Sequence, residues 1–449
     1  MNRKKVLALL MTSALSVSML AACGSSASTD TTAADNAASA VVADDTAAEG
    51  TESAEAAEAA DTAAAEDPDA GSYGPIYDEY SEMSSEELYE LAKEEGGEIN
   101  VYATSSKMLK EEEAFEEAFP GLDVVISDLD NDEVLEKTKT EYDTGNIEGD
   151  VLQVKDAAGD VFYDYYDEGV VQAFYPKDIC EHINPDLLKY GYPLYSSMSF
   201  WYYNTDAFPD GQPINSWWNV LDTNEDGSQK YSIYTKEIGQ EQAYLSMFAT
   251  FIQHADEMEK AYEDEYGQPL EYTYDASAFD FEVPENNAGV EYLYRFAQLQ
   301  MTFISDGDEL VQAVANSTAD APALCLCSGG KIANRDESGY AIAWVTNLTP
   351  FTGLENVEYM YLVGGTDKPA GARLFIRWVT GDTDGKSGGL KPFMKEGVFI
   401  ARDDVINESN PIATVAEAGA VAPDIAGIYE RYLDTQDMWT YWLDQNPNM

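Results

Sequence analysis

The fold is decided by residues 98–156, EINVYATSSKMLKEEEAFEEAFPGLDVVISDLDNDEVLEKTKTEYDTGNIEGDVLQVKD. Three apolar runs rich in β-branched residues alternate here with two acidic, amphipathic stretches. The apolar runs are 99–103, 122–127 and 150–154, and the amphipathic stretches are 107–119 and 133–142. Strands that alternate with helices at this spacing predict an α/β fold, in which a mainly parallel sheet is flanked by helices.

Polar residues follow two of these predicted strands. The first strand ends at Thr104, Ser105 and Ser106, where hydroxyls and free helix-terminal N–H groups can converge on an oxygen-rich or anionic ligand. The third strand ends at Asp156 and Ala157. Because ligands of such sheets bind beyond the carboxyl ends of the strands, we expect a small-molecule cleft here. Capping of the following helices is the alternative role for these side chains.

The N-terminus predicts export and lipidation. Three basic residues, at positions 3–5, precede an apolar run over 6–19, and Leu-Ala-Ala-Cys follows at 20–23. This pattern resembles a bacterial lipobox, which implies a signal peptide over residues 1–22 and a lipid on Cys23. An ordinary secretory signal is the alternative. The mature protein is then expected to be extracytoplasmic and anchored to the cell membrane by lipid, without spanning it.

An acidic, low-complexity segment follows the predicted lipid site. Residues 24–75 consist mainly of Ala, Thr, Ser, Asp and Glu. Such a segment cannot bury enough apolar surface to offset its ordering entropy, so residues 23–80 are expected to form a disordered tether. Folded structure is predicted to begin near Ser84, because Ser84 and Glu87 have the spacing of a helix capping box.

Charge excludes one class of partner. The chain of 449 residues has 84 acidic and 25 basic residues, for a formal net charge of -59. This composition does not provide the broad basic surface that nucleic-acid binding requires, so nucleic acid is excluded as a partner.

Motifs for catalysis and metal binding are weak. The sequence has two histidines, His182 and His254, and lacks HExxH, GxSxG and P-loop patterns, so we expect no enzyme activity. Residues 222–227, DTNEDG, match half of a calcium loop, but the twelfth position is Ile233, so a polar turn is favoured. We therefore expect neither a metal site nor a cofactor.

Three cysteines remain in the predicted mature chain besides Cys23. Cys325 and Cys327 lie two apart in an apolar run and would face the same side of a strand, and Cys180 stands alone. Small buried apolar side chains are favoured over a disulfide or a metal site.

The motifs together resemble a known family. The quoted motifs are LYELAKEEGGEINVYATSS at 88–106, EAFEEAFPGLDVVISDL at 113–129, GDVLQVKDAA at 149–158, YSSMSFWYYNTDAF at 195–208, NSWWNVLD at 215–222 and GARLFIRW at 371–378. They are similar to bacterial extracellular solute-binding proteins of ABC importers, in the branch of ferric-iron, thiamine, polyamine and phosphonate binders. The resemblance implies a two-lobed, type II periplasmic-binding-protein fold with crossover hinge segments, and a cleft lined by residues 104–106.

The resemblance also implies a ligand position in the second lobe. An apolar strand is followed by Ser328, Gly329, Gly330 and Lys331. This position resembles the site at which ferric-binding members of the family carry two adjacent tyrosines that ligate iron. Without phenolates there, simple ferric binding is disfavoured. The glycines allow close backbone approach to a ligand and Lys331 adds a cation, although a tight turn with a solvated lysine explains the pattern equally well.

Aromatic residues are the third set of candidate ligand contacts. Trp201 and Tyr202, in the predicted crossover strand, could stack on an organic ligand or surround an ammonium group. Core or hinge packing is the alternative for most of the aromatic residues.

The complete hypothesis is a monomeric substrate-binding protein that captures a small polar organic solute, anionic in one version and cationic in another, for an ABC permease. The folded domain is expected over residues 85–449. The first lobe comprises about 98–198 and 344–399, and the second about 199–343 and 400–449. The alternatives are a secreted enzyme, an adhesin or sensor module with the same fold, and a protein whose ligand is ferric iron or an iron complex.

Overall fold

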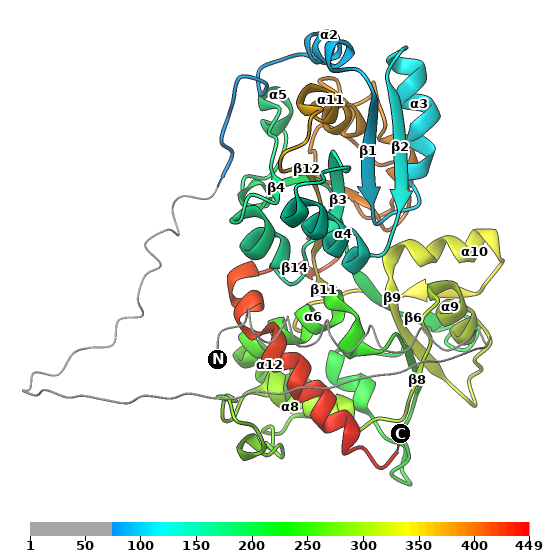
Figure 1. Ribbon diagram of the computed structural model, residues 1–449. Coiled ribbons are helices and arrows are strands. Elements are labelled where there is room, and N and C mark those ends of the chain that lie inside the picture. The colour runs from blue at the N-terminus through cyan, green and yellow to red at the C-terminus, as the bar shows by residue number, and fades with distance from the viewer. Residues whose placement is uncertain (1–73, 449) are drawn as a thin grey trace, which may run out of the picture. The chain divides into compact units, whose positions relative to one another are not determined.

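The computed structural model describes residues 74–448 (Figure 1). The predicted signal peptide, Cys23 and most of the predicted tether lie outside these residues. Within them, none of the helices has both the length and the apolar character needed to cross a membrane.

The described chain begins with the expected helix. Helix α2 (Ser85–Glu95) starts with a complete capping box, in which Ser84 accepts from the backbone N–H of Glu87 and the Glu87 carboxylate accepts from that of Ser84. Leu88 and Ala92 are buried on one face, as their spacing predicts. The sequence therefore predicted this helix with its correct start.

The first sheet has the strand order β13-β5-β12-β3-β1-β2, with β4 paired to β12. Its strands are β1 (Glu98–Ala103), β2 (Asp123–Asp128), β3 (Val151–Lys155), β4 (Val171–Gln172), β5 (Tyr192–Ser197), β12 (Asn356–Val363) and β13 (Phe399–Ile400). The helical segments of this lobe, besides α2, are η2 (Met108–Lys110), α3 (Glu111–Ala118), α4 (Asn131–Thr144), the π-helical η3 (Val161–Tyr166), α5 (Lys177–Cys180), η4 (Leu187–Lys189), α11 (Pro369–Val379) and η9 (Lys391–Phe393).

The second sheet has the order β10-β6-β9-β7-β8. Its strands are β6 (Ser199–Asn204), β7 (Ser232–Thr235), β8 (Met301–Phe303), β9 (Ala323–Ser328) and β10 (Ile342–Trp344). The helical segments of this lobe are η5 (Trp217–Leu221), η6 (Ile238–Gln240), α6 (Gln242–Gln253), α7 (Ala255–Tyr266), η7 (Ala276–Ala278), α8 (Ala288–Ala297), α9 (Gly307–Ala315), η8 (Gly329–Ala333), α10 (Asn334–Glu337) and α12 (Ile425–Asp444). A small parallel pair joins β11 (Gly353–Leu354) to β14 (Ala420–Val421).

Both sheets are mixed rather than mainly parallel. Strands β1, β2 and β3 are parallel, as the sequence predicts, but β12 runs antiparallel to both β3 and β5. In the second sheet β7, β8 and β9 are parallel, whereas β6 is antiparallel to β9 and β10. The antiparallel strands β5, β6, β10 and β12 adjoin the segments that pass between the sheets, so they are not bound by the strand–helix–strand pattern that keeps neighbours parallel.

Three segments join the two sheets. Consecutive strands β5 and β6 belong to different sheets and are separated by Met198, the chain returns from β10 to β12 through β11, and it leaves again after β13. A Cβ on Gly353 would lie 3.0 Å from the Ser199 carbonyl oxygen, and one on Gly397 would lie 2.5 Å from the Gly329 carbonyl carbon. The crossover segments therefore pass at distances that glycine accommodates best.

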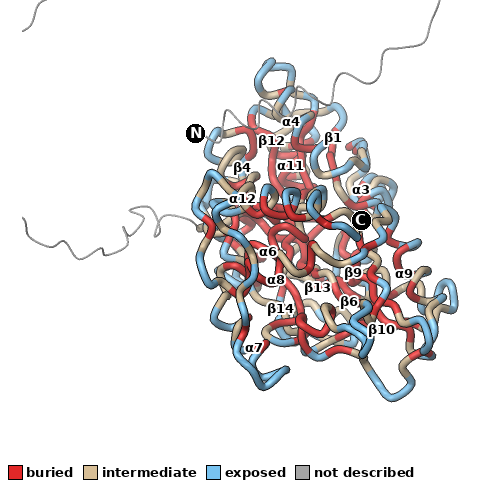
Figure 2. Tube along the Cα trace, turned by 90° about the horizontal axis from the view of Figure 1, so that it is seen from below, coloured by how far each residue is buried: buried red, intermediate tan, exposed pale blue. Residues whose placement is uncertain are grey.

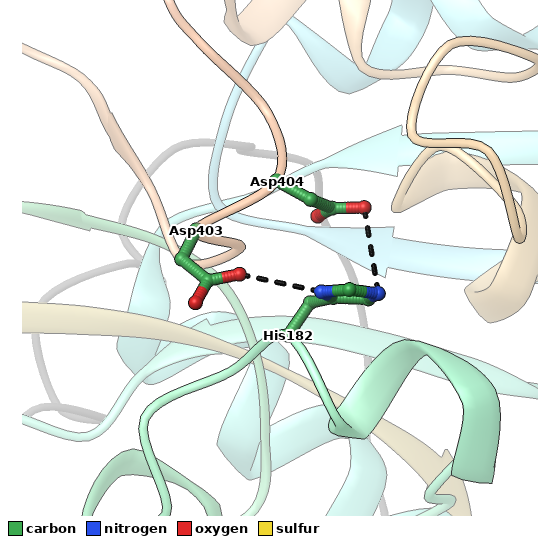
Figure 3. A group of neighbouring side chains, drawn as sticks. All are labelled: His182, Asp403 and Asp404. Atoms are coloured by element: carbon green, nitrogen blue, oxygen red, sulfur yellow. Dashed lines mark ion pairs between the residues drawn. The ribbon is translucent and has the colours of Figure 1, made fainter.

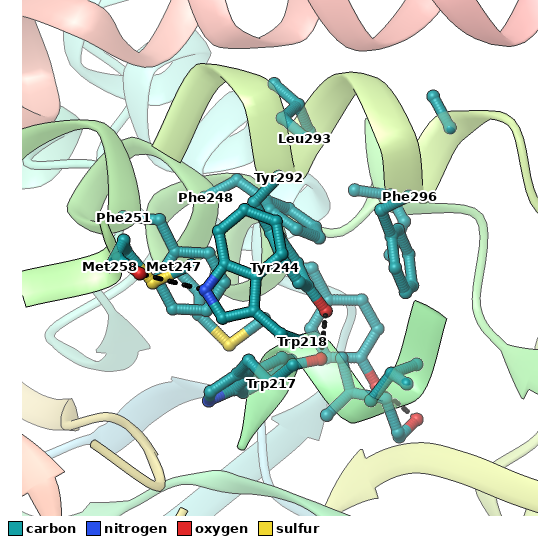
Figure 4. Close-up of a cluster of buried hydrophobic side chains, with 14 of the residues drawn as sticks. Trp217, Trp218, Tyr244, Met247, Phe248, Phe251, Met258, Tyr292, Leu293 and Phe296 are labelled. Atoms are coloured by element: carbon teal, nitrogen blue, oxygen red, sulfur yellow. Dashed lines mark hydrogen bonds between the residues drawn. The ribbon is translucent and has the colours of Figure 1, made fainter. Parts of the chain in front are cut away.

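An aromatic cluster fills the core of the second lobe (Figure 4). Trp217 and Trp218 are almost completely buried there. Their indole N–H groups donate to the backbone carbonyls of Phe351 and Met258, each at 2.9 Å. The rings thus contribute apolar burial without leaving a polar group unpaired. Figure 2 shows such buried segments running through the interior, with exposed loops outside them.

The cysteines have the expected environment. Cys180, Cys325 and Cys327 are free thiols and all are buried. Cys325 and Cys327 lie in β9 against an apolar cluster, and burial raises the pKa of both thiols. The prediction of small apolar side chains, rather than a disulfide, is confirmed.

Glu111 is an uncompensated acid in the first lobe. It is the first residue of α3 and only 1% exposed, and within the described residues no group donates a hydrogen bond to its Oε1. Its Oε2 would lie 2.6 Å from a Cβ at Gly389. Burial raises the pKa of Glu111 to about 8 from the ordinary 4.5.

We predict that Glu111→Gln removes part of the pH dependence of stability. The folded state keeps the Glu111 proton up to about pH 8, so wild-type stability falls as the pH rises from about 4.5 to about 8, by on the order of a few kcal/mol. Chemical denaturation across this range measures the slope. Its control is Glu113→Gln, at an exposed position in the same helix; equal slopes for all three proteins would contradict the prediction.

Candidate functional site

A buried carboxylate organises the carboxyl end of the first sheet. Glu358 in β12 lies opposite Lys155, at the end of β3, and is 2% exposed. It accepts hydrogen bonds from Gln153 Nε2 and, at 3.4 Å, from Thr104 Oγ1, and its Oε1 lies 3.5 Å from Lys155 Nζ. Hydrogen bonds and an ion pair thus offset the cost of burying this charge.

The same network holds the loop after β1. The Thr104 N–H donates to Gln153 Oε1 at 3.1 Å. Ser105 is buried, and both Ser105 and Glu358 lie close enough to the Tyr195 phenol to act on its pKa. Burial raises the pKa of Tyr195 well above its ordinary value. Side chains from β3, β5 and β12 therefore hold Thr104 and Ser105 in place.

Beyond these two residues the loop becomes accessible. Ser106 is exposed and Lys107 is half-buried. Burial lowers the pKa of Lys107, and the nearby charges of Lys155 and Lys331 lower it further, whereas Glu358 opposes the shift.

The second sheet contributes the loop after β9. The exposed Ser328 ends this strand, and Gly329 and Gly330 begin η8. Lys331 Nζ forms an ion pair with Asp308 Oδ1 at 2.8 Å. The loop predicted from sequence is thus the start of a short 3-10 helix, and Lys331 is 34% exposed.

Tyr202 supports this loop from below. Its hydroxyl is 2.8 Å from the Ser328 carbonyl oxygen and 2.9 Å from that of Gly329, and it accepts from Trp344 Nε1 at 3.0 Å. Tyr202 is fully buried. Tyr202 therefore fixes the position of the loop backbone at Ser328 and Gly329.

Residues from the two sheets meet at these carboxyl ends. Gln242 Nε2 donates to Asp160 Oδ2 at 3.0 Å, and Tyr429 Oη to Asp164 Oδ1 at 3.0 Å. The charge of Glu241 acts on Lys155, and that of Lys331 acts on Lys107. The polar loops of both sheets therefore share one region.

Besides Tyr202, three of the predicted ligand contacts occupy structural positions. The Asp156 carboxylate accepts from the backbone N–H groups of Val161 and Phe162, each at 3.0 Å, so it caps η3, and burial raises its pKa to about 6. Ala157 is buried beside it. Trp201 is fully buried in the core, with its ring centroid 5.7 Å from that of Trp217. Thr104, Ser105, Ser106 and the loop from Ser328 to Lys331 are the predicted residues that lie together.

Sequence reasoning missed the network beneath the loop. Its members are Gln153, Lys155, Tyr195 and Glu358, together with Lys107 beside it. One signal was present, since Glu358 is a carboxylate within the apolar run of Asn356–Val363, where an acid is retained only with buried partners. The partners themselves come from β3 and β5, far away in the sequence.

One other cluster has metal-like spacing among the described residues. His182, Asp403 and Asp404 bring their ligand atoms within 4.8 Å of one another (Figure 3). Asp404, however, already receives hydrogen bonds from Arg402 Nε at 2.9 Å and Nη2 at 2.8 Å, and Asp403 is exposed. These contacts describe an ion-pair network at the surface.

The chain also matches a known protein family. The chain matches the family described as bacterial extracellular solute-binding protein over residues 112–387, and it belongs to that family. No curated protein matches the sequence.

Solved structures share the fold at low sequence identity. The substrate-binding protein of an ABC transporter from Agrobacterium tumefaciens is 13% identical, with a TM-score of 0.54, and the match covers 78% of this chain and 94% of that one. Iron-bound HitA from Pseudomonas aeruginosa is 13% identical, with a TM-score of 0.53 and coverage of 77% and 99%. A Trichodesmium protein in complex with iron and citrate is 13% identical, with a TM-score of 0.52 and coverage of 77% and 99%.

We predict that Tyr195→Phe weakens solute binding by about 5- to 30-fold, because the buried phenol hydroxyl next to Ser105 and Glu358 is lost from beneath the loop. The matched control is Tyr192→Phe in the same strand, whose hydroxyl bonds Thr380 Oγ1 at 3.0 Å, away from the loop. Both variants lose about 1 kcal/mol of stability. The amount of solute retained through native purification, measured by mass spectrometry, separates them; equal retention would contradict the role of Tyr195.

Proposed function

We propose that the protein is the lipid-anchored substrate-binding component of an ABC importer, which captures a small polar solute between its lobes and delivers it to the permease. The observation that carries the proposal is the meeting of two polar loops, Thr104–Lys107 and Ser328–Lys331, at the carboxyl ends of the parallel strands of two sheets. Membership of the solute-binding family supports it, as does the fold shared with an ABC-transporter binding protein.

The crossover segments supply a mechanism. Solute contacts from both loops favour a closed arrangement of the lobes, and the permease recognises that arrangement. The peptide segments around Met198 and Glu355 absorb the rotation, because they are the short connections between the sheets. The protein binds its solute without turnover and works as a monomer.

Ferric iron is the second candidate, because solved relatives in fold hold it. The end of β9 has Cys327 and Ser328, followed by Gly329, in place of phenolate ligands. Tyr195, the tyrosine of the first-sheet network, has a pKa raised well above its ordinary value by burial, which disfavours the phenolate that ferric iron requires. A bare ferric ion is therefore the weaker candidate.

Native purification followed by mass spectrometry tests the proposal. The full chain is purified without denaturant, the bound solute is released by unfolding, and the released solute is added back in a thermal-shift assay. We expect one low-mass solute that is recovered unchanged and raises the melting temperature of the emptied protein. Chemical conversion of that solute would indicate an enzyme, and absence of any released or stabilising solute would contradict the importer function.

Lipidation predicts a specific label. The intact chain grown with a fatty-acid analogue should incorporate it, and Cys23→Ala should abolish incorporation and move the protein out of the membrane fraction. Cys180→Ala, which changes a buried thiol of the folded lobe, is the control and should stay labelled. Label on the Cys23→Ala variant would refute the anchor.

A further inference from the structure

Four lysines lie just after, or at, the carboxyl ends of parallel strands. Lys107 follows β1, Lys155 ends β3, Lys236 follows β7, and Lys331 follows β9. The strands belong to both sheets. In a chain with 84 acidic residues and 25 basic ones, this concentration of positive charge at the strand ends needs an explanation.

The four ammonium groups are close enough for their charges to act on shared neighbours. Lys155 and Lys331 both lower the pKa of Lys107, and Lys236 and Lys331 both lower that of Cys327. Glu241, the ion-pair partner of Lys236 at 2.6 Å, also acts on Lys155. The lysines from the two sheets therefore form one group rather than two independent surface patches.

Three of these lysines have a carboxylate partner. Lys155 pairs with Glu358, Lys236 with Glu241 and Lys331 with Asp308. The three lysines stay partly accessible, since the side chains of Lys155, Lys236 and Lys331 are 41%, 37% and 34% exposed. The carboxylates hold the lysines in place while leaving part of each side chain accessible to a ligand.

Lys107 differs from the other three. It forms no ion pair within the described residues and is half-buried, and the like charges of Lys155, Lys331 and Lys110 act on it against the opposite charge of Glu358. A charge that is partly desolvated beside two like charges destabilises the protein in the absence of a counter-ion. An anion placed among these ammonium groups would relieve that repulsion.

We infer that the solute is an organic anion, whose carboxylate or phosphate-type oxyanion binds between Lys107 and Lys155 of the first lobe and Lys331 of the second. This inference rests on the proposed function, because it names the class of solute that the importer takes. Ser106 supplies an exposed neutral hydroxyl in the same loop as Lys107, which suits an oxyanion with several acceptor oxygens. Because the anion contacts lysines of both lobes, it favours closure of the lobes. A cation would be repelled by the same lysines.

Thermal shift with size-matched probes tests the charge class. The probes are anions (succinate, citrate, glycerol 3-phosphate), cations (putrescine, spermidine, choline) and neutral polyols (glucose, glycerol, inositol). We expect stabilisation by anions alone, weakened by added salt, with the carboxylates and the phosphate ester distinguishing the two oxyanion types. Stabilisation by a cation or a polyol instead of an anion would overturn the inference.

Variants of neighbouring lysines test the position. Lys107→Met should lower affinity for the stabilising anion by about 10- to 100-fold, the effect of losing one charge-assisted contact. Lys110→Met changes an exposed lysine three residues further along the same segment and should stay within about twofold of wild type. Equal affinities of wild type and Lys107→Met would overturn the assignment.

The charge of the solute released from wild-type protein gives a readout that needs no variant. An anionic solute supports the inference. A cationic or neutral solute overturns it and leaves the importer function standing, whereas no released solute together with no stabilising probe contradicts both.

Discussion

The passage of the chain between two sheets is the constraint on which the rest of the structure depends. β5 and β6 are consecutive, yet they lie in different sheets with Met198 between them. Two further crossings follow, through β11 and after β13, and backbones of the two lobes approach closely at Gly353 and Gly397. Because of these crossings, the carboxyl ends of β1 and β3 share one region with those of β7 and β9, and the loops after those strands can act on a common ligand.

Electrostatics then determines what that region can hold. Buried Glu358 is satisfied by Gln153, Thr104 and Lys155, so it behaves as part of the scaffold and orients the loop above it. Lys107 has no such partner among the described residues. The contrast between a paired acid below the loop and an unpaired base within it favours a negatively charged ligand, although the whole protein is strongly acidic.

Local features of the chain were predictable because they depend on neighbours in sequence. The capping box of Ser84 and Glu87, the strand–helix alternation over residues 98–156 and the apolar environment of Cys325 and Cys327 all follow from such patterns. The loops at Thr104–Ser106 and Ser328–Lys331 were also predicted, from their positions after apolar strands. The roles of Trp201 and Asp156 could not be predicted in the same way. Trp201 lies in the core and Asp156 caps η3, and only their tertiary surroundings distinguish these roles from ligand contacts.

The sequence by itself determined the α/β class, the start of helix α2 and the two loops that carry polar groups, since hydrophobic periodicity and turn chemistry act over a few residues. The tertiary structure decided the mixed direction of the sheets, the partners of Glu358 and the gathering of four lysines from two lobes. These features join residues as far apart as Thr104 and Glu358, or Lys107 and Lys331. Such contacts exist only once the crossover strands have brought the two sheets together.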